Sequence, residues 1–418
     1  MFLNKRLFLL AIYAITAIAL KAQYQFIHYD IDNGLPHNMS ESILRDFKGF
    51  LWVGTYGGVS KFDGVSFQNY TETDKRSGVP GNTVFKLIED SERNLWVATN
   101  KGIALYNRDL DCFKTIDKTN NICIWDIAEF KKGLLIAISN YEIFLFNTKT
   151  LKLEEFFNTK NGLPFGLLSR CITDNKGLLW IGTINDGLFS FNLKTKAYNQ
   201  YTLEKSTLNS SSSYSIKALC FDSRGKLWIG TTNAGIYVLD TSKRETSYLK
   251  SEASNDNTIG STMVYSIFRD IKGGMWVGCQ NGYLNKFDPK TGNFTRIKPD
   301  LYNENYLQSN SISNIYEDTD GNIWFGTYNH GIYCLNKQLS GFVKHTMDKY
   351  NSNSLRNNFV RGFVEYNGSI IIAMDGGGLQ LFDPRSQTFS NFHGNSFTSN
   401  HFMDISLQGD ELWCPTWG

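Results

Sequence analysis

The stretch EDTDGNIWFGT, residues Glu317–Thr327, decides the fold of this chain. It contains the end of one strand, a polar turn at Asp320–Asn322 and a second strand that carries a tryptophan. Close copies occur as DSERNLWVAT at residues 90–99 and as DSRGKLWIGT at residues 222–231. Because a phrase that recurs along a chain indicates a repeat architecture, the spacing of the copies is the first feature to interpret.

The copies continue through the chain after its N-terminal segment. They centre on Trp52, Trp96, Trp180, Trp228, Trp276 and Trp324. The third and eighth repeats have Leu134–Ile138 and Ile372 where the tryptophan is expected, and a ninth repeat begins at Glu411–Trp413. From Trp180 to Ile372 every step is 48 residues. A period of this length, with four short strands per unit and no helical pattern, is typical of an all-β propeller.

Each repeat is expected to form one four-stranded blade. In the seventh repeat the predicted strands are Ser313–Glu317 (inner), Ile323–Thr327 (tryptophan strand), Gly331–Leu335 (third) and Phe342–His345 (outer). We expect the tryptophan to cover the neighbouring blade, and the glycine two residues after it to allow close approach of the backbone. The Asp-x-x-Gly phrase ahead of the tryptophan supplies turn chemistry.

A lone strand at residues 24–29 precedes the first inner strand and has no blade of its own. We expect it to be the outer strand of the last blade, where it closes the ring and hides a sheet edge. The sequence thus predicts a seven-bladed propeller over residues 23–340 and the first blades of a second propeller over residues 341–418. A ring of eight or more blades is the alternative. Because the sequence stops inside the ninth repeat, we expect a fragment of a longer protein.

The first 22 residues have the features of a cleaved signal peptide. Lys5 and Arg6 form a positive region, Leu7–Leu20 is apolar and uncharged, and Ala22 offers a small residue for cleavage. A membrane anchor is the alternative, but this apolar run is shorter than the ~20 residues that a spanning helix needs. We therefore predict an exported, soluble mature chain.

Composition excludes several function classes. With 42 basic and 40 acidic residues, the net charge of +2 gives no electrostatic reason to expect nucleic acid as a partner. The seven cysteines are scattered and make no C-x-x-C pair, so neither a zinc site nor a disulfide framework is indicated. We expect them to be small buried apolar residues.

In a propeller, the loops between second and third strands open on one face around the axis. Residues that every repeat shares are expected to be scaffold, whereas residues that differ are candidates for binding. The ligand-binding candidates at this mouth are Tyr56, Lys101, Asp186, Asn233, Gln280, Tyr328 and His330. Polar and aromatic groups of this kind suit sugar hydroxyls and ring faces. Because Asn before Gly also suits a tight turn, a purely structural role is the alternative for the asparagines that recur every 48 residues.

No catalytic constellation stands out. The six histidines show no H-x-H or H-E-x-x-H spacing, and G-x-S-x-G and phosphate-loop motifs are missing from the sequence. The acidic pairs Glu89–Asp90 and Glu317–Asp318 recur at one repeat position, which favours a structural turn over acid–base chemistry. We expect no catalytic residue, no metal and no cofactor in this chain.

The phrases at Ile88–Thr99 and Ile315–Thr327, with Asn33–Pro36 ahead of the first repeat, resemble two-component regulator propeller repeats. The resemblance implies the periplasmic sensor region of a hybrid two-component system, an ectodomain anchored in the inner membrane. It further implies two consecutive seven-bladed propellers, a β-sandwich, a membrane helix, a histidine kinase, a receiver and a DNA-binding domain. Such sensors typically respond to oligosaccharides and act as homodimers.

Three functions follow from these observations. The first is a ligand-sensing region that binds an oligosaccharide or other small ligand. It would touch no nucleic acid itself, and it would meet the membrane only through a segment beyond Gly418. The second is a secreted polysaccharide lyase or glycosidase, which requires a basic or acidic cluster at the mouth. The third is a scaffold that binds protein partners.

Overall fold

In a computed structural model, the structure describes residues 26–417 except 77, 162, 164, 175, 202, 204–214, 301–305, 337–344, 393–396, 398 and 410. The chain divides into two compact units, residues 1–340 and residues 341–418. The predicted signal peptide and most of the predicted outer strand at Phe342–His345 lie outside the described residues. Within the described ranges, no helix is long and apolar enough to cross a membrane.

The first unit contains seven four-stranded antiparallel sheets among its described residues. The inner strands are β2 (Ser40–Arg45), β6 (Val84–Glu89), β10 (Asp126–Lys131), β14 (Leu168–Thr173), β18 (Ile216–Phe221), β22 (Val264–Arg269) and β26 (Ile312–Glu317). The second strands are β3 (Leu51–Thr55), β7 (Leu95–Thr99), β11 (Leu134–Ile138), β15 (Leu179–Thr183), β19 (Leu227–Thr231), β23 (Met275–Cys279) and β27 (Ile323–Thr327).

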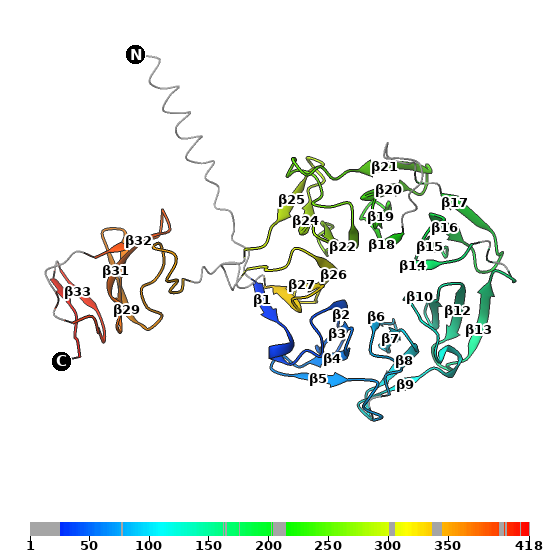
Figure 1. The fold of residues 1–418 in the computed structure, drawn as a ribbon, viewed down its shortest axis with the longest axis horizontal. Coiled ribbons are helices and arrows are strands. Elements are labelled where there is room, and N and C mark those ends of the chain that lie inside the picture. The colour runs from blue at the N-terminus through cyan, green and yellow to red at the C-terminus, as the bar shows by residue number, and fades with distance from the viewer. Residues whose placement is uncertain are drawn as a thin grey trace, which may run out of the picture. The chain divides into compact units, whose positions relative to one another are not determined.

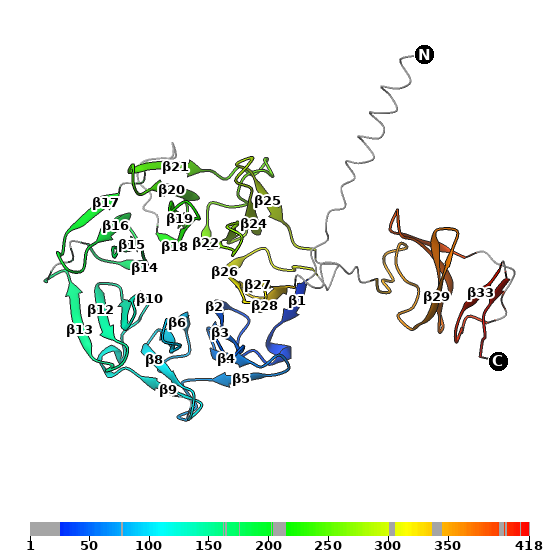
Figure 2. The same cartoon turned by 180° about the vertical axis from the view of Figure 1, so that it is seen from behind.

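The third strands are β4 (Gly58–Phe62), β8 (Gly102–Asn107), β12 (Glu142–Asn147), β16 (Leu188–Phe191), β20 (Ile236–Asp240), β24 (Leu284–Phe287) and β28 (Ile332–Leu335). The outer strands are β5 (Phe67–Tyr70), β9 (Cys112–Thr115), β13 (Leu153–Asn158), β17 (Tyr198–Tyr201), β21 (Glu245–Leu249), β25 (Phe294–Ile297) and β1 (Phe26–Tyr29). Two short 3-10 helices, η1 (Ile31–Asn33) and η2 (Asp117–Thr119), lie in connections. Each inner strand contacts the next, and β26 contacts β2, so the sheets form a closed ring (Figures 1 and 2). The all-β propeller fold is confirmed.

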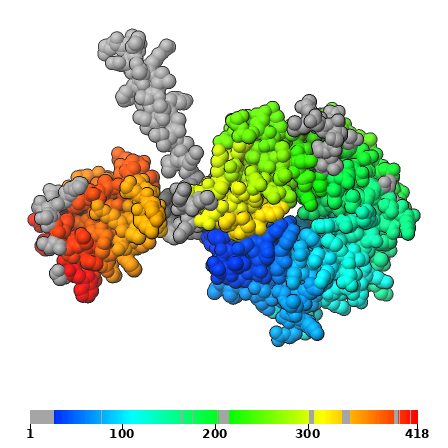
Figure 3. All heavy atoms as spheres, viewed as in Figure 1, coloured from blue at the N-terminus to red at the C-terminus, as the bar shows by residue number. Residues whose placement is uncertain are grey.

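The ring closes through β1, which is the outer strand of the sheet that contains β26, β27 and β28. Its register pairs Phe26 with Leu335 and Tyr29 with Ile332. Phe26 is buried and meets the rings of Phe325 and Tyr333 at centroid distances of 6.0 and 6.3 Å. In Figure 3 the blue start of the unit lies directly against its yellow end. Strand pairing and aromatic packing therefore both hold the closure.

The aspartate of the repeat binds the turn and the tryptophan together. Asp318 Oδ1 accepts hydrogen bonds from the backbone N–H groups of Asp320 (3.0 Å) and Asn322 (2.9 Å). Its Oδ2 accepts the indole N–H of Trp324 at 2.9 Å. The same aspartate–indole bond occurs in five further blades, at 2.9–3.2 Å. The predicted turn role of the aspartate is confirmed, and the bond to the indole is an addition to it.

Tryptophan and glycine have the packing roles predicted for them. Trp52 of the first blade meets Tyr106 of the second with ring centroids 4.6 Å apart, and Trp228 meets Phe287 of the following blade at 5.0 Å. A Cβ atom on Gly182 would lie 2.5 Å from Cγ2 of Ile216, the first residue of the next inner strand. The glycine therefore lets adjacent blades approach where a side chain would collide.

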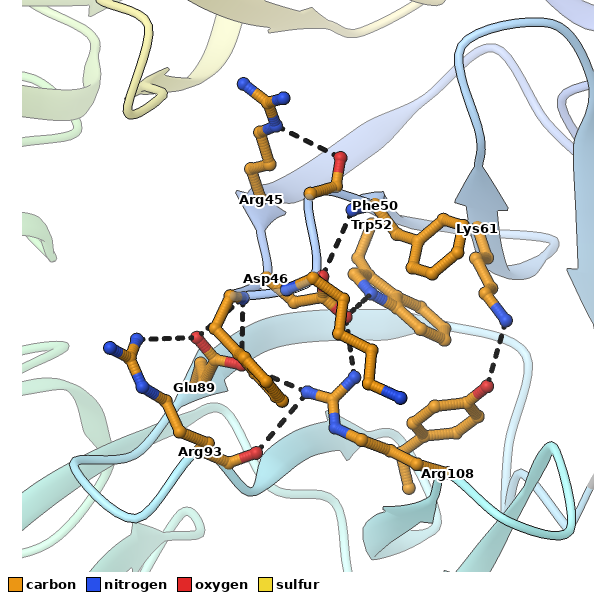
Figure 4. A network of polar contacts seen from close by, with 12 residues as sticks. Arg45, Asp46, Phe50, Trp52, Lys61, Glu89, Arg93 and Arg108 are labelled. Carbon is orange, nitrogen blue, oxygen red and sulfur yellow. Dashed lines mark hydrogen bonds and ion pairs between the residues drawn. The ribbon is translucent and has the colours of Figure 1, made fainter.

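A polar network ties the first two blades together on the side of the aspartate turns (Figure 4). Arg108 donates to Asp46 Oδ2 at 2.7 Å and to Glu89 Oε1 at 3.0 Å. Its guanidinium carbon lies 4.7 Å from the centroid of the Phe47 ring, and the backbone N–H of Phe47 bonds both oxygens of Glu89. The buried carboxylate of Asp46 also accepts the indole N–H of Trp52. This one carboxylate therefore links its own turn, the tryptophan and the neighbouring blade.

The second unit contains one four-stranded sheet and one two-stranded sheet among its described residues. Their strands are β29 (Val360–Tyr366), β30 (Ser369–Met374), β31 (Gly378–Asp383), β32 (Thr388–Asn391), β33 (Ser406–Gln408) and β34 (Glu411–Trp413). Ile372 lies in β30, at the place of the tryptophan strand. Ile371, Ala373, Phe402 and Ile405 form a buried core between the two sheets.

Replacing Asp318 by alanine is expected to destabilise the first unit strongly. The change leaves two backbone N–H groups and the Trp324 indole without their acceptor, which we expect to lower the free energy of unfolding by about 3 kcal/mol. Urea unfolding followed by tryptophan fluorescence measures this. Asp320→Ala on the same turn is the control, because its carboxylate is exposed and, among the described residues, forms an ion pair with Arg45 alone; we expect a loss below about 1 kcal/mol. Equal losses for both variants would contradict the role assigned to Asp318.

Candidate functional site

A β-bulge near the start of the inner strand recurs in six blades of the first unit. The extra residue is the second residue of the strand, and a bulge of this kind changes the direction in which a side chain points. The bulge residues are Glu41, Phe85, Ser169, Lys217, Tyr265 and Ser313. In the remaining blade, Trp125 immediately precedes β10. We call these seven residues the axial ring.

The axial ring lies at the predicted mouth. The first residue of each bulged strand pairs with the last residue of the second strand, as Ser40 does with Thr55. The turn to the third strand follows directly, so bulges and turns share one end of the propeller. The inner strands that carry the bulges surround the centre in Figure 1.

Serines of the axial ring link adjacent inner strands. Ser169 Oγ donates to the Ile216 carbonyl at 2.7 Å, and Ser313 Oγ donates to the Ser40 carbonyl. These two positions are therefore structural. The other bulge residues are charged or aromatic, and they belong to a different group of contacts.

Charged side chains from three blades act electrostatically on one another across the ring. Glu41 of β2 interacts electrostatically with Arg170 of β14 and Lys217 of β18. Since β2 and β14 lie on opposite sides of the ring (Figure 1), these side chains must point toward its centre. Burial raises the pKa of Glu41, and the two cations offset this only in part. Burial lowers the pKa of Lys217, and Arg170 lowers it further.

Aromatic side chains flank the charges. The rings of Tyr265 and Tyr328 meet edge to face at 5.3 Å. Burial raises the pKa of Tyr328, and its side-chain hydrogen bond with Tyr265 adds to the rise. Tyr56 interacts with Glu41, Arg170 and Tyr265, and burial raises its pKa. In the adjoining part of the axial ring, Phe85 meets Trp125 at 4.7 Å.

Two of the seven predicted site residues, Tyr56 and Tyr328, lie within this group. Lys101 pairs with Glu72 in the connection after β5, and the His330 carbonyl accepts from His28 of the closing strand at 2.7 Å. The remaining three lie in their predicted turns: Asp186 and Asn233 are exposed and Gln280 is half-buried. Their role in binding stays a prediction.

Sequence reasoning missed Glu41, Arg170, Lys217 and Tyr265. Part of the signal was present, because the second residue of the six bulged inner strands changes in chemistry from repeat to repeat while the first residue stays apolar or small. Strand alternation alone assigns that residue to a sheet face, and only the bulge turns it to the axis. Within the described residues, no group of three His, Cys, Asp or Glu side chains is placed to hold a metal ion.

The first unit is thus a β-propeller in which shared residues build the blades and differing residues gather at one axial end. The two-component regulator propeller repeat matches four segments of the chain, residues 34–57, 78–101, 210–233 and 306–329. The resemblance that the sequence predicted is confirmed. The comparison with curated proteins gives no match.

Solved structures with this fold include the extracellular domains of two hybrid two-component systems of B. thetaiotaomicron. The BT3049 domain is 23% identical, with a TM-score of 0.65 over 94% of this chain and 52% of its own. The BT4673 domain is 21% identical, with a TM-score of 0.63 over 94% of this chain and 51% of its own. Virginiamycin B lyase from Staphylococcus aureus is 14% identical, with a TM-score of 0.57 over 75% of this chain and 98% of its own. At these identities the likeness establishes the fold, and the chain spans about half the length of the two sensor domains.

Glu41→Gln is expected to stabilise the protein near neutral pH. Because the pKa of Glu41 is raised on folding, the folded state holds its proton more tightly, and stability falls as pH rises through the unfolded and folded pKa values. Glutamine removes this cost, so the gain in melting temperature should be larger at pH 7 than at pH 4.

Melting followed by circular dichroism at both pH values measures the difference. Glu155→Gln, an exposed change on outer strand β13, is the control and should alter neither value appreciably. A loss of stability for Glu41→Gln at pH 7 would show that attraction to Arg170 and Lys217 outweighs the burial of the carboxylate.

Proposed function

We propose that this chain is the extracytoplasmic ligand-sensing region of a hybrid two-component sensor and that its ligand is an oligosaccharide. The observation that carries the proposal is the axial ring, where side chains that differ between otherwise similar blades meet around one axis. Repeats of the two-component regulator propeller type support the class of protein. The folds of the BT3049 and BT4673 domains support it as well.

The chemistry of the axial end suits a sugar. Tyr56, Tyr265 and Tyr328 present ring faces and hydroxyls side by side, and Trp125 and Phe85 add apolar faces. Aromatic faces contact the C–H surface of a pyranose, while hydroxyl and charged groups bond its oxygen atoms. A mouth lined by both kinds of group can therefore fix the orientation of a saccharide.

The proposed signal passes through parts of the protein beyond this sequence. Ligand binding at the axial end, or between domains, would shift the geometry of a homodimer. A membrane segment and a histidine kinase would relay the shift and regulate transcription. In this proposal residues 1–22 direct export to the periplasm, and residues 341–418 begin a second propeller.

A lyase or glycosidase is the second candidate. It is favoured by the likeness to a lyase fold and by Lys217 and Tyr265, which place a cation and a phenol at the axis. Incubation of the full chain with polysaccharides, followed by chromatography of the products, separates the two functions. Turnover that Lys217→Gln abolishes would favour the enzyme.

Binding of oligosaccharides to the full chain by isothermal titration calorimetry tests the sensing function. We expect at least one member of a broad panel of plant, algal and host oligosaccharides to bind. Tyr265→Ala and Tyr328→Ala should each weaken that binding about tenfold, because each removes an aromatic face. Tyr350→Ala, an exposed change in the second unit, is the matched control. If no member of the panel binds measurably, that result would count heavily against direct sensing of oligosaccharides.

A further inference from the structure

The axial end carries more positive than negative charge. Lys86 follows bulge residue Phe85 in β6, and it interacts electrostatically with Cys171 of β14 and Cys220 of β18. It therefore also points toward the axis. Together with Arg170 and Lys217, it gives three cations near the axis, where the described carboxylates are those of Glu41 and Asp126. The chain as a whole is close to neutral, with a net charge of +2, so this concentration of cations is local.

These cations differ from several other partly buried cations of the first unit, which are paired with carboxylates. Arg108 bonds two carboxylates, Lys61 bonds Asp111 and Arg296 bonds Asp256. In the part of the chain that the structure describes, the side chains of Lys86 and Lys217 form neither a hydrogen bond nor an ion pair. The Arg170 guanidinium donates to the Ser169 carbonyl at 2.8 Å and forms no ion pair with a described residue. Most N–H groups of these three side chains therefore have no hydrogen-bond acceptor among the described residues.

Partly buried cations with few partners repel one another. Arg170 and Lys217 act on each other, and burial weakens the water screening that would separate them. Glu41 and Asp126 oppose two of the three charges, and the Asp126 carboxylate also accepts the backbone N–H groups of Ile127 and Cys171. A negatively charged group between these side chains would relieve the repulsion. A carboxylate or a sulfate group can accept two hydrogen bonds from the Arg170 guanidinium.

We propose that the axial end of the first propeller binds an acidic saccharide, one that carries carboxylate or sulfate groups. The acidic group meets Arg170, Lys217 and Lys86, and the sugar ring lies against the tyrosines at the mouth, Tyr56, Tyr265 and Tyr328. The assignment rests on the proposed sensing function and adds the class of ligand. The cations recognise the charge, and the aromatic faces distinguish a saccharide from a simple anion.

Matched pairs of oligosaccharides test this assignment. Oligogalacturonates and neutral galacto-oligosaccharides differ in the carboxylate, and sulfated and desulfated chondroitin disaccharides differ in the sulfate. Isothermal titration calorimetry on the full chain should show at least one acidic member binding at least about tenfold more tightly than its less charged partner. The affinity should fall as the salt concentration rises, because the interaction is electrostatic.

Variants localise the effect. Arg170→Gln and Lys217→Gln should each weaken binding of the acidic ligand about tenfold or more, whereas Arg170→Lys should retain part of the affinity. Lys114→Gln, an exposed lysine on outer strand β9, is the matched control and should bind as the unmodified chain does. Circular dichroism identifies any variant that fails to fold, and Lys217→Gln and Arg170→Lys then provide independent readings.

The outcomes separate the two proposals. If only neutral oligosaccharides bind, or if Arg170→Gln and Lys217→Gln leave acidic binding unchanged, the acidic class is overturned and oligosaccharide sensing stands. If inorganic sulfate, measured by competition at equal ionic strength, binds as tightly as the sulfated disaccharide does, the site recognises an anion and not a saccharide. If neither series binds, both proposals fail.

Discussion

One aspartate carboxylate, present in six of the seven blades, makes the interaction on which the first propeller depends. In each of six blades it accepts backbone N–H groups from its own turn and the indole N–H of the tryptophan six residues later. The turn therefore cannot change shape without moving the tryptophan, and the tryptophan packs on the next blade. Local turn geometry and contacts between blades are set by the same atoms. In the third blade, Leu134–Ile138 pack as a wholly apolar second strand without this bond.

The bulge is the position at which the chemistry of the side chain varies between blades. It leaves one residue of the inner strand outside the pairing, so that residue can be glutamate, lysine, phenylalanine or tyrosine while the ladder on either side remains intact. Serine at the same position is used to bond the next strand. Residues that bond the next strand and residues proposed to bind a ligand thus differ in type within one backbone feature, which explains how similar blades surround an axis of mixed chemistry.

The sequence allowed the fold to be predicted closely because its repeat is local. Strands such as Ile323–Thr327 and Leu134–Ile138 have the bounds that the repeat spacing predicted. The candidate site was harder, because it depends on contacts between distant residues. Lys101 lies in the same turn of its blade as Tyr56 does, one position later, but its side chain pairs with Glu72. His330 follows Tyr328 by two residues, but its carbonyl contacts the closing strand. Which loop side chains reach the axis is set by the bulge register and by neighbouring blades, and neither is visible in one repeat.

The pairing of β1 with β28 has a consequence for the order of folding. A chain synthesised from its N-terminus produces Phe26 first, and Leu335, its partner in the ladder, only after all the intervening blades. Ring closure is therefore the contact of greatest sequence separation and the one with the largest loop-closure entropy. Until it forms, β28 presents an unpaired edge that can recruit another strand. We expect this closure to be the slow step of folding and the point at which a misassembled, strand-exchanged dimer would arise.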